Sequence, residues 1–471
     1  MLRMRLNFLR PALLLPLAAF LLAACDGEKV EYDPDIYDIE WILLDGTAAT
    51  GVAGEYGSLG VASPDNRPGG RTGAVAWTER DEETDLEVFW LFGGTGYDAD
   101  GLVGPLNDLW KYEKQGDGSL QWTWVAGSAT TVGATADYDG VGLPGLPGGR
   151  NQALGWIDAD GALWLFGGSG RDGSGSTGRL NDLWTYADGS WTWVGGSSTA
   201  DQAGIYGTAG TADPGNWPGS RYAAGGWVDD DGGFWLFGGN GFAAGSGCCW
   251  LNDLWKYEDG SWTWMKGSSS ANAEAVYGTT GEPDDDNTPG ARYGMAAWHT
   301  PDVVTTDEDD LQAGWIFGGT GADDEADRVV LNEIWRFDHE SGDWIFILGS
   351  KGAFSAGSYG GRGQFAFTNV PPSRHRPVAW QTGSTLWMFG GAVEKTAGTV
   401  TRPNDLWRFD TVGWTWVGGA SSDNPDGDYP ELAGEVGQPG GREGGVGWVD
   451  DLGSLWLLGG EARSDFWIFP R

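Results

Sequence analysis

The chain has 471 residues, and its 67 acidic side chains outnumber the 28 basic ones to give a formal net charge of −39 at pH 7. This balance excludes nucleic acid as a partner, because phosphate binding requires clustered lysine and arginine. Acidic side chains at this density keep a protein soluble, and Asp-rich loops could also bind a cation such as Ca²⁺. No other cofactor is predicted.

Residues 1–25 have the order of an export signal. Basic side chains at the start are followed by an apolar run over residues 12–22, which is too short to span a bilayer comfortably. Leu22-Ala23-Ala24-Cys25 resembles the lipobox of bacterial lipoproteins, and this resemblance implies cleavage before Cys25 and lipidation of its thiol. We therefore expect an exported protein that only a lipid at Cys25 holds to a bacterial membrane, in the periplasm or at the cell surface, with residues 26–38 as an acidic tether.

The rest of the chain repeats one unit, which is complete in residues 221–264. The unit contains Arg-x5-Trp, then Trp-Leu-Phe-Gly-Gly, Leu-Asn-Asp-Leu-Trp and Trp-Thr-Trp. Arg-x5-Trp occurs six times with a period of about 70 residues, beginning at Arg71, Arg150, Arg221, Arg292, Arg374 and Arg442. Alternating side chains and short Gly-containing turns predict four antiparallel strands, a to d, in each repeat.

The paired glycines that end strand b in all six repeats make residues 39–471 resemble the kelch repeat of β-propellers, in the superfamily of the galactose oxidase propeller. The resemblance implies an all-β fold in which each repeat forms one blade. Kelch units have about 50 residues, so this chain carries extra length. The insertion after strand d is regular, with a Tyr 10 or 11 residues after the Gly that ends strand d.

The sixth repeat ends near Phe469 and has no strand d of its own. Residues 39–46 match the pattern of strand d, with Trp41 five residues before its Gly. We expect this N-terminal strand to complete the last blade, which would close a six-bladed ring and remove an exposed sheet edge. The prediction is one domain, and a monomer.

Long connections are predicted on one end of the blades. Five segments between strands b and c have 12 residues each, and binding residues are often carried by loops on a rigid scaffold. Trp217 and Trp250 are the two tryptophans that the repeat does not explain. With Phe242, Cys248 and Cys249 they form a candidate loop patch, for which packing within the loops is the alternative. A bond between the adjacent cysteines is left open, because their Cα atoms are closer than is usual for a disulfide.

A second candidate site lies at the channel mouth. The six strand-a arginines are predicted to pair with the Asp of Asn-Asp-Leu-Trp, and the residue after each one varies: Thr72, Asn151, Tyr222, Tyr293, His375 and Glu443. Polar residues at one fixed place could line a pocket. The chain is also similar to the kelch-like sialic acid mutarotases of bacterial periplasms, which implies roles for Arg374, His375, Arg376 and Glu443. A copper oxidase site is not expected, because the chain has only three His residues.

Two functions follow from these patterns. The first is a lipid-anchored, non-enzymatic module that presents its long connections to a protein or glycan at the cell envelope. The alternative is an enzyme that acts on a sugar acid at the channel, although no general acid or base is recognisable. The first predicts ligand contacts across the loop patch, and the second predicts them at the channel mouth.

Overall fold

The structure is a computed structural model that describes residues 40–471, except 82–85, 131–134, 246, 302–311, 324–327, 353 and 411. Ile39–Arg471 form one compact unit. The predicted signal (1–25) and tether (26–38) lie outside the described residues. Within the described part, no α-helix is present and no helix is long and apolar enough to cross a membrane.

The strands form antiparallel sheets in which strand a pairs with b, b with c and c with d. The first two sheets in chain order are β3 (Val75–Asp81), β4 (Leu86–Phe92), β7 (Leu109–Lys114) and β8 (Leu120–Ala126), and then β11 (Leu154–Ile157), β12 (Leu163–Arg171), β13 (Thr177–Ala187) and β14 (Ser190–Gly195). The third sheet consists of β16 (Gly225–Val228), β17 (Phe234–Phe242), β18 (Cys248–Glu258) and β19 (Ser261–Lys266). The fourth and fifth are β21 (Ala296–Thr300), β22 (Ala313–Phe317), β25 (Ile334–Asp338) and β26 (Asp343–Leu348), and then β28 (Val378–Thr382), β29 (Thr385–Phe389), β32 (Leu406–Phe409) and β33 (Trp414–Gly418).

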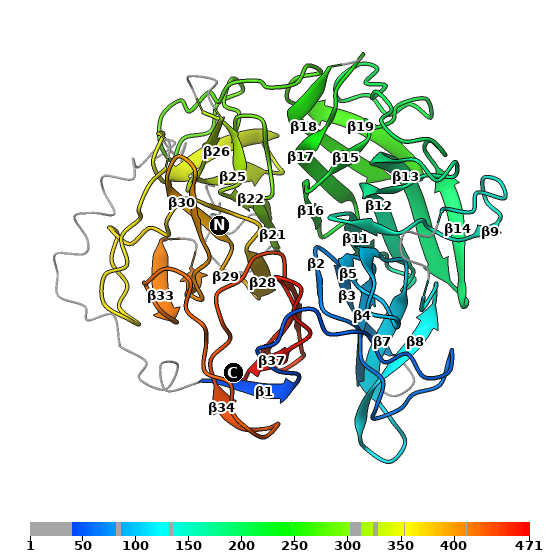
Figure 1. The fold of residues 1–471 in the computed structure, drawn as a ribbon. Helices are drawn as coiled ribbons and strands as arrows, with labels where there is room; N and C mark the ends of the chain where they lie inside the picture. The colour runs from blue at the N-terminus through cyan, green and yellow to red at the C-terminus, as the bar shows by residue number, and fades with distance from the viewer. Residues whose placement is uncertain are drawn as a thin grey trace, which may run out of the picture. The chain divides into compact units, whose positions relative to one another are not determined.

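The last sheet contains both ends of the compact unit (Figure 1). Its strands are β35 (Val446–Val449), β36 (Leu455–Leu458), β37 (Phe466–Phe469), β1 (Trp41–Asp45) and β34 (Val436–Gly437). The N-terminal strand β1 pairs antiparallel with β37, with Ile42 opposite Ile468 and Leu43 opposite Trp467, and its other edge pairs with β34. The first strand of the described chain therefore covers the edge of the last one.

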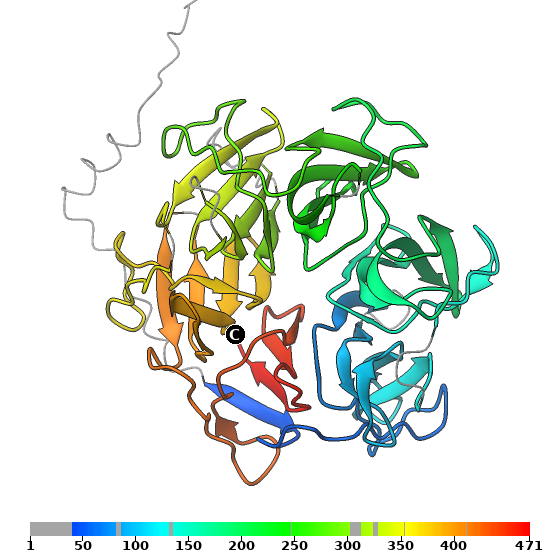
Figure 2. The ribbon, with the colours of Figure 1, turned by 45° about the horizontal axis from the view of Figure 1, so that its top comes forward.

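The innermost strands contact one another in cyclic order: β3 with β11, β11 with β16, β16 with β21, β21 with β28, β28 with β35, and β35 with β3. Figure 2 shows the sheets arranged around a common axis. The chain thus has a β-propeller fold, and the sheets are called blades 1 to 6 below.

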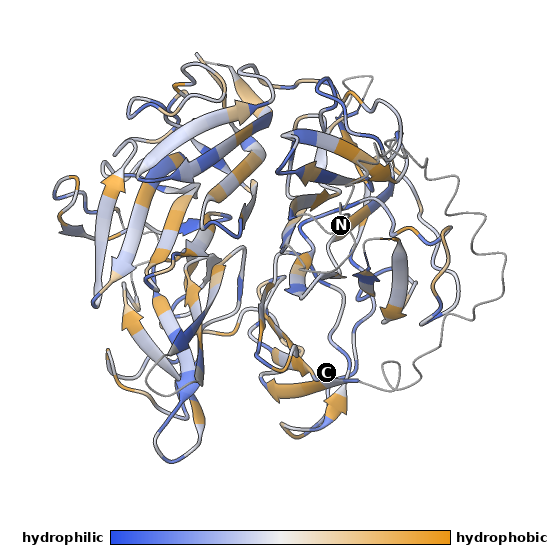
Figure 3. Ribbon diagram, turned by 180° about the vertical axis from the view of Figure 1, so that it is seen from behind, coloured by the Kyte–Doolittle hydropathy of each residue, from blue (hydrophilic) through white to orange (hydrophobic). Residues whose placement is uncertain are grey.

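Packing between neighbouring blades buries the repeated aromatic residues. In one such layer Val75 and Trp77 of blade 1 pack with Leu163 and Trp184 of blade 2. The strand-c tryptophans are fully buried at Trp110, Trp184, Trp255, Trp335, Trp407 and Trp467. Figure 3 shows the hydrophobic residues concentrated along the strands. Because each blade buries its apolar faces only against its neighbours, the core is shared between repeats.

The predicted ion pair between strand a and strand c is present in every blade, with N···O distances of 2.7–2.8 Å. In blade 3, Asp253 accepts hydrogen bonds from Arg221, from the Tyr206 hydroxyl and from Trp255 Nε1. Tyr206 belongs to the regular insertion after strand d, so the insertion returns to the blade core. Blade 4 has Glu333 in place of Asp.

The segments between strands b and c are more ordered than the sequence indicated. We predicted long loops, but these segments are hairpins that extend the blades. They consist of β5 (Thr95–Tyr97) and β6 (Val103–Pro105), β23 (Thr320–Ala322) and β24 (Arg328–Val330), β30 (Ala392–Thr396) and β31 (Thr399–Thr401), and the ends of β12–β13 and β17–β18.

Each hairpin is joined by the two residues that begin strand a, which are β2 (Arg71–Thr72), β10 (Arg150–Asn151), β15 (Arg221–Tyr222), β20 (Arg292–Tyr293) and β27 (Arg374–His375). A further short strand, β9 (Pro144–Gly145), pairs with β14. Backbone pairing therefore satisfies polar groups that a free loop would leave to water.

Candidate binding site at the propeller axis

A ring of backbone hydrogen bonds surrounds the propeller axis. The second residue after each strand-a arginine donates its N–H to the carbonyl oxygen of its counterpart in the preceding blade, with N···O distances from 2.6 to 3.0 Å. The N–H of Gly73 donates to the carbonyl of Gly444, which closes the ring, and the N–H of each later member donates to the carbonyl of the member before it. We call these residues the axial ring; they are Gly73, Gln152, Ala223, Gly294, Arg376 and Gly444.

All members of the axial ring have φ between 52° and 68°. This left-handed conformation is readily accessible to glycine and costs about 1–2 kcal/mol for other residues. The strain at Gln152, Ala223 and Arg376 is offset by hydrogen bonds to both neighbours in the ring. Hydrogen bonds to the adjacent blades therefore fix the backbone conformation of Arg376, and this conformation places its side chain near the axis.

The variable residues of strand a directly precede the axial ring, and we call them the rim residues. They are Thr72, Asn151, Tyr222, Tyr293, His375 and Glu443. Asn151 donates to Thr95 Oγ1 of the preceding blade at 2.6 Å, and Thr72 Oγ1 donates to the Gly444 carbonyl at 3.2 Å. The structure thus brings these six predicted positions together around one axis.

Charged side chains gather on the blade 5 and 6 side of the rim. Glu443 is only 5% exposed and lies between two arginines. Arg376 Nη2 pairs with Glu443 Oε2, while Arg402 donates to Glu443 Oε1 through Nε at 3.1 Å and Nη2 at 2.8 Å. Arg402 also pairs with Glu461 at 2.6 Å. The side chains of Arg376 and Arg402 are 31% and 34% exposed, so both are open to solvent.

His375 is a neutral imidazole in this environment. Burial lowers its pKa to about 4, and the positive charge of Arg376 acts in the same direction. Arg376 Nε donates to His375 Nδ1 at 3.3 Å, which requires an unprotonated Nδ1. A histidine with this pKa carries no charge near neutral pH.

Aromatic side chains lie on the blade 3 and 4 side. The rings of Tyr222 and Tyr293 are 6.2 Å apart in an edge-to-face arrangement. Arg179 of blade 2 reaches across to blade 3, where it donates to Asn240 Oδ1 at 2.7 and 3.0 Å and lies over the rings of Tyr222 and Phe242. Burial raises the pKa of Tyr222, and Arg376 lies near enough to act on the same group.

No protein-family model matches the chain, and no curated protein matches it. A solved structure of YjhT is similar to it. The two chains share 14% sequence identity, the alignment covers 87% of this chain and 95% of the other, and the TM-score is 0.49. The propeller assignment rests on the strand pairings and the axial ring described above.

Trp250 lies within strand β18 and not in a separate loop. It lies in β18 opposite Asn240. Its backbone N–H donates to Asn272 Oδ1 at 3.1 Å, and Asn272 N–H donates to its carbonyl at 2.7 Å. Arg179 makes the same two bonds with Asp201, and Arg402 N–H donates to Asn424 Oδ1.

Trp250, Arg179 and Arg402 therefore occupy the same position in blades 3, 2 and 5. Each of the two arginines reaches the rim residue of the following blade, Tyr222 for Arg179 and Glu443 for Arg402. Trp250 is the residue at this position in blade 3, and Tyr293 is the rim residue of the blade that follows.

Trp217 is partly buried and packs against the core, which favours the alternative of packing over an exposed binding residue. Its Nε1 donates to the Asn181 carbonyl at 2.8 Å, and its ring is 6.5 Å from that of Trp262, so it packs between blades 2 and 3. The backbone bridge between Ile205 and Trp217 has a counterpart in every blade. A Pro follows this position in all six repeats. This spacing could have shown that Trp217 occupies a regular position of the repeat.

Arg374 was predicted to line the channel mouth, but the structure places it elsewhere. It is fully buried and makes two hydrogen bonds to Asp405. Sequence reasoning missed Arg179 and Arg402, which contact rim residues, and Glu461, which pairs with Arg402. Arg179 and Arg402 stand three residues before the Asp of their blades, as Trp250 does, and Glu461 directly follows the paired glycines. These fixed spacings are the signal that could have identified them.

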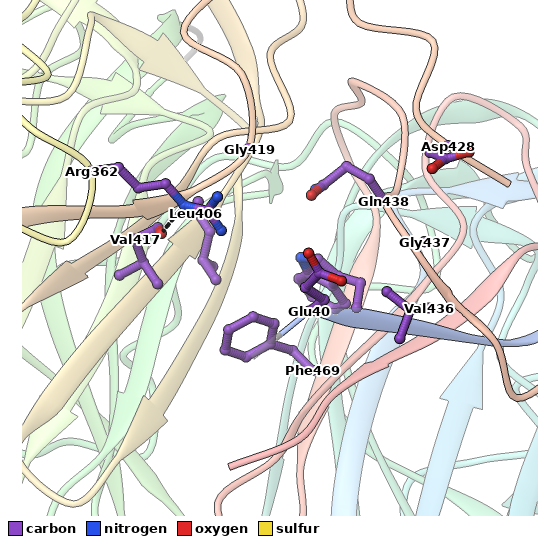
Figure 4. Close-up of a pocket in the computed structure, with 12 residues that line it drawn as sticks. Glu40, Arg362, Leu406, Val417, Gly419, Asp428, Val436, Gly437, Gln438 and Phe469 are labelled. Atoms are coloured by element: carbon purple, nitrogen blue, oxygen red, sulfur yellow. Dashed lines mark hydrogen bonds between the residues drawn. The ribbon is translucent and has the colours of Figure 1, made fainter. Parts of the chain in front are cut away.

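Two other features do not form part of the site. A cavity of about 150 Å³ lies at the outer edge of blades 5 and 6, where Arg362 Nε donates to the Val417 carbonyl and Trp41 and Phe469 line the wall (Figure 4). Ligand pockets are usually about 300–1,000 Å³, so this cavity is small for a metabolite. Among the described residues, the exposed carboxylates of Asp284, Asp285 and Asp286 lie within 4.8 Å of one another. Such groups are common without an ion, and Ca²⁺ binding stays a prediction.

Proposed function

We propose that this protein is an exported, lipid-anchored, kelch-type propeller whose axial face binds a small sugar acid. The observation that carries the proposal is the pair Arg376 and Arg402, each about one-third exposed, held around the buried Glu443 beside the Tyr222–Tyr293 pair. A protein with 67 acidic and only 28 basic side chains thus places several of its arginines at one axis.

The two sides of the rim suit the two parts of such a ligand. Among the described residues, the contacts above use Nε and Nη2 of both Arg376 and Arg402 and leave Nη1 for a ligand carboxylate. Charge-assisted bonds from guanidinium to carboxylate are strong and directional. The rings of Tyr293 and Trp250 offer apolar faces, and the hydroxyl groups of the two tyrosines can bond to sugar hydroxyls.

Binding is favoured over catalysis by the state of the titratable groups. General acid–base catalysis is most efficient when the pKa of the catalytic group lies near the working pH. Burial holds the pKa of His375 at about 4, well below neutral pH. The enzymatic alternative, a mutarotase-like reaction on a sugar acid, would use the same face.

The test is calorimetric titration with sialic acid and glucuronic acid, with glucose as the neutral control. Arg376→Gly is the informative variant, because three other members of the axial ring are glycine and the backbone conformation should persist. Loss of a hydrogen bond to a charged group costs about 1.5–3 kcal/mol, so we expect binding at least about tenfold weaker.

Arg362→Ala, at the outer cavity, serves as the matched control and should bind as wild type does. Equal affinity for glucose and glucuronic acid, or unchanged binding by Arg376→Gly, would contradict the proposal. Faster anomeric exchange of a bound sugar acid, followed by NMR, would favour the enzymatic alternative.

A further inference from the structure

Cys248 and Cys249 are adjacent thiols at an accessible strand end. They begin β18, opposite Phe242 and Gly241 of β17. Cys248 is exposed and Cys249 is partly exposed. Neither takes part in the sugar-acid site proposed above, and the inference drawn from them does not depend on that function.

The backbone brings the two sulfur atoms together. Successive side chains of a strand normally point to opposite faces of the sheet, which would separate the two thiols. Here the Sγ atoms of the two free thiols are 2.6 Å apart, compared with about 2.05 Å in a disulfide bond. Both side chains have therefore turned to the same side at the point where β18 begins.

Access, and not a lowered pKa, favours reaction at these sulfurs. Thiolate, and not thiol, is the reactive form, and nearby cations stabilise it. The positive charge of Arg179 acts on the Cys249 thiol, although hydrogen bonding with Cys248 gives a net raised pKa. Because Cys248 is exposed, a small disulfide in solution can reach it first.

We propose that Cys248 and Cys249 form a redox-active vicinal dithiol that small-molecule disulfides oxidise to a vicinal disulfide. The Cys248 thiolate attacks one sulfur of the oxidant and forms a mixed disulfide, which releases one thiolate. The Cys249 thiolate then attacks Cys248 Sγ and releases the second. The protein loses two electrons and two protons, and one oxidant molecule is reduced to two thiols.

The bond should be reversible. Adjacent Cα atoms are about 3.8 Å apart, below the usual range of about 4.4–6.8 Å for disulfides, so dithiol reductants should reopen the ring readily. Such a pair differs from a structural disulfide, which resists reduction. An exported protein would meet the oxidising conditions in which this exchange runs forward.

The experiment treats the full-length protein with glutathione disulfide, alkylates free thiols with N-ethylmaleimide, and analyses the tryptic peptide 222–256 by mass spectrometry. This peptide contains both cysteines and no other. We expect it to lose two hydrogen atoms, to take up no alkylating agent and to keep no glutathione. Treatment with dithiothreitol should restore two alkylation sites.

Cys248→Ser and Cys249→Ser supply the controls. Without a resolving thiol, the remaining cysteine should keep glutathione as a mixed disulfide. The native protein should also close the bond at least about tenfold faster than the urea-unfolded protein, because the fold holds the sulfurs together. Equal rates, retained glutathione in the wild type, or a bond between two protein molecules would overturn the proposal.

Discussion

At the scale of single residues, the position of a tryptophan within the repeat determines which neighbours it has. Trp217 precedes the Pro that recurs in every repeat, and its Nε1 donates to the Asn181 carbonyl of the neighbouring blade. Trp250 occupies the place that Arg179 and Arg402 use to reach the rim of the next blade. Identical side chains in one repeat therefore have different expected roles.

Alanine substitution should separate these roles. Trp217→Ala removes interblade contacts and leaves a carbonyl without its donor, so we expect a loss of about 2 kcal/mol or more in unfolding free energy. Trp250→Ala should change stability by less than about 1 kcal/mol but weaken sugar-acid binding about tenfold.

Urea unfolding and calorimetry measure the two effects. Trp184→Ala, at a fully buried strand-c position, is the reference for core loss and should cost about 3–5 kcal/mol. A Trp250 variant that unfolds as easily as the Trp184 variant would show that Trp250 belongs to the core.

Histidine at the opposite end of the blades should make stability depend on pH. Burial lowers the pKa of His339 from 6.5 to about 4, with His299 acting in the same direction, and Trp227 Nε1 donates to His339 Nε2. Asp229, Asp338 and Lys256 also act on this group.

The unfolded chain binds a proton near pH 6.5 while the folded protein does so only near 4. The free energy of unfolding should therefore fall as the pH decreases from 6.5 to about 4. Below about pH 4 both states are protonated at His339, and this group should cause no further loss. His339→Gln keeps an acceptor for Trp227 and should make stability less sensitive to pH. Urea titrations between about pH 7 and 4 test this. An unchanged slope would assign the acid sensitivity to other groups.

At the scale of elements, the hairpins between strands b and c determine which side chains reach the axis. They extend the blades by regular strand pairing. In blade 3 this register places Asn240, which follows Gly-Gly, between Tyr222 at the start of strand a and Trp250 at the start of strand c. If the proposed site binds a ligand, substitution at these positions should change its specificity without altering the pairing of the blade.

The strand β1 is the element whose removal should have the largest effect. It lies between β37 and β34, and Trp41 and Leu43 are 2% and 3% exposed. Deletion of residues 26–46 would uncover the edge of β37 and the aromatic residues beneath it.

We expect the truncated protein to have a clearly lower thermal unfolding midpoint and to aggregate. Differential scanning calorimetry of the two proteins is the measurement. Deletion of residues 26–38 alone, which retains β1, is the control and should leave the midpoint unchanged. Equal midpoints for all three proteins would show that β1 does not stabilise the last blade.

At the scale of the whole molecule, the buried ion pairs explain how similar blades keep a fixed strand order. Each arginine and carboxylate is almost completely buried, and removal of one partner from such a pair costs about 3–5 kcal/mol. Tyrosine from the long insertion bonds to the same carboxylate. The insertions that lengthen each repeat therefore stabilise the blades.

Attachment to a membrane is the prediction that concerns the entire protein. Cys25→Ser should block lipidation, because the thiol is the acceptor of the lipid. Metabolic labelling with a fatty-acid analogue measures this, and Cys248→Ser is the matched control, which should be labelled as wild type is. Equal labelling of the Cys25 variant and wild type would refute the lipoprotein interpretation.

Much of the architecture could be predicted from the sequence, since the repeated Arg, Gly-Gly, Asp and Trp positions report contacts that recur in every blade. They indicated the all-β propeller, the pairing of Arg221 with Asp253 and the burial of Trp255, all of which the structure has. Hydrophobic periodicity and fixed spacing suffice for this, because these contacts lie within one repeat or between adjacent repeats.

The candidate site was only partly predictable. The rim residues stood out because they vary at a fixed position, but Arg402 and Glu443 are 41 residues apart and belong to different blades. Only the tertiary structure brings them together, whereas the spacings to Pro218 and to Asp253 could have separated Trp217 from Trp250 in the sequence. The positions of these side chains recur at fixed spacings, but which of them contact one another depends on the arrangement of the blades around the axis.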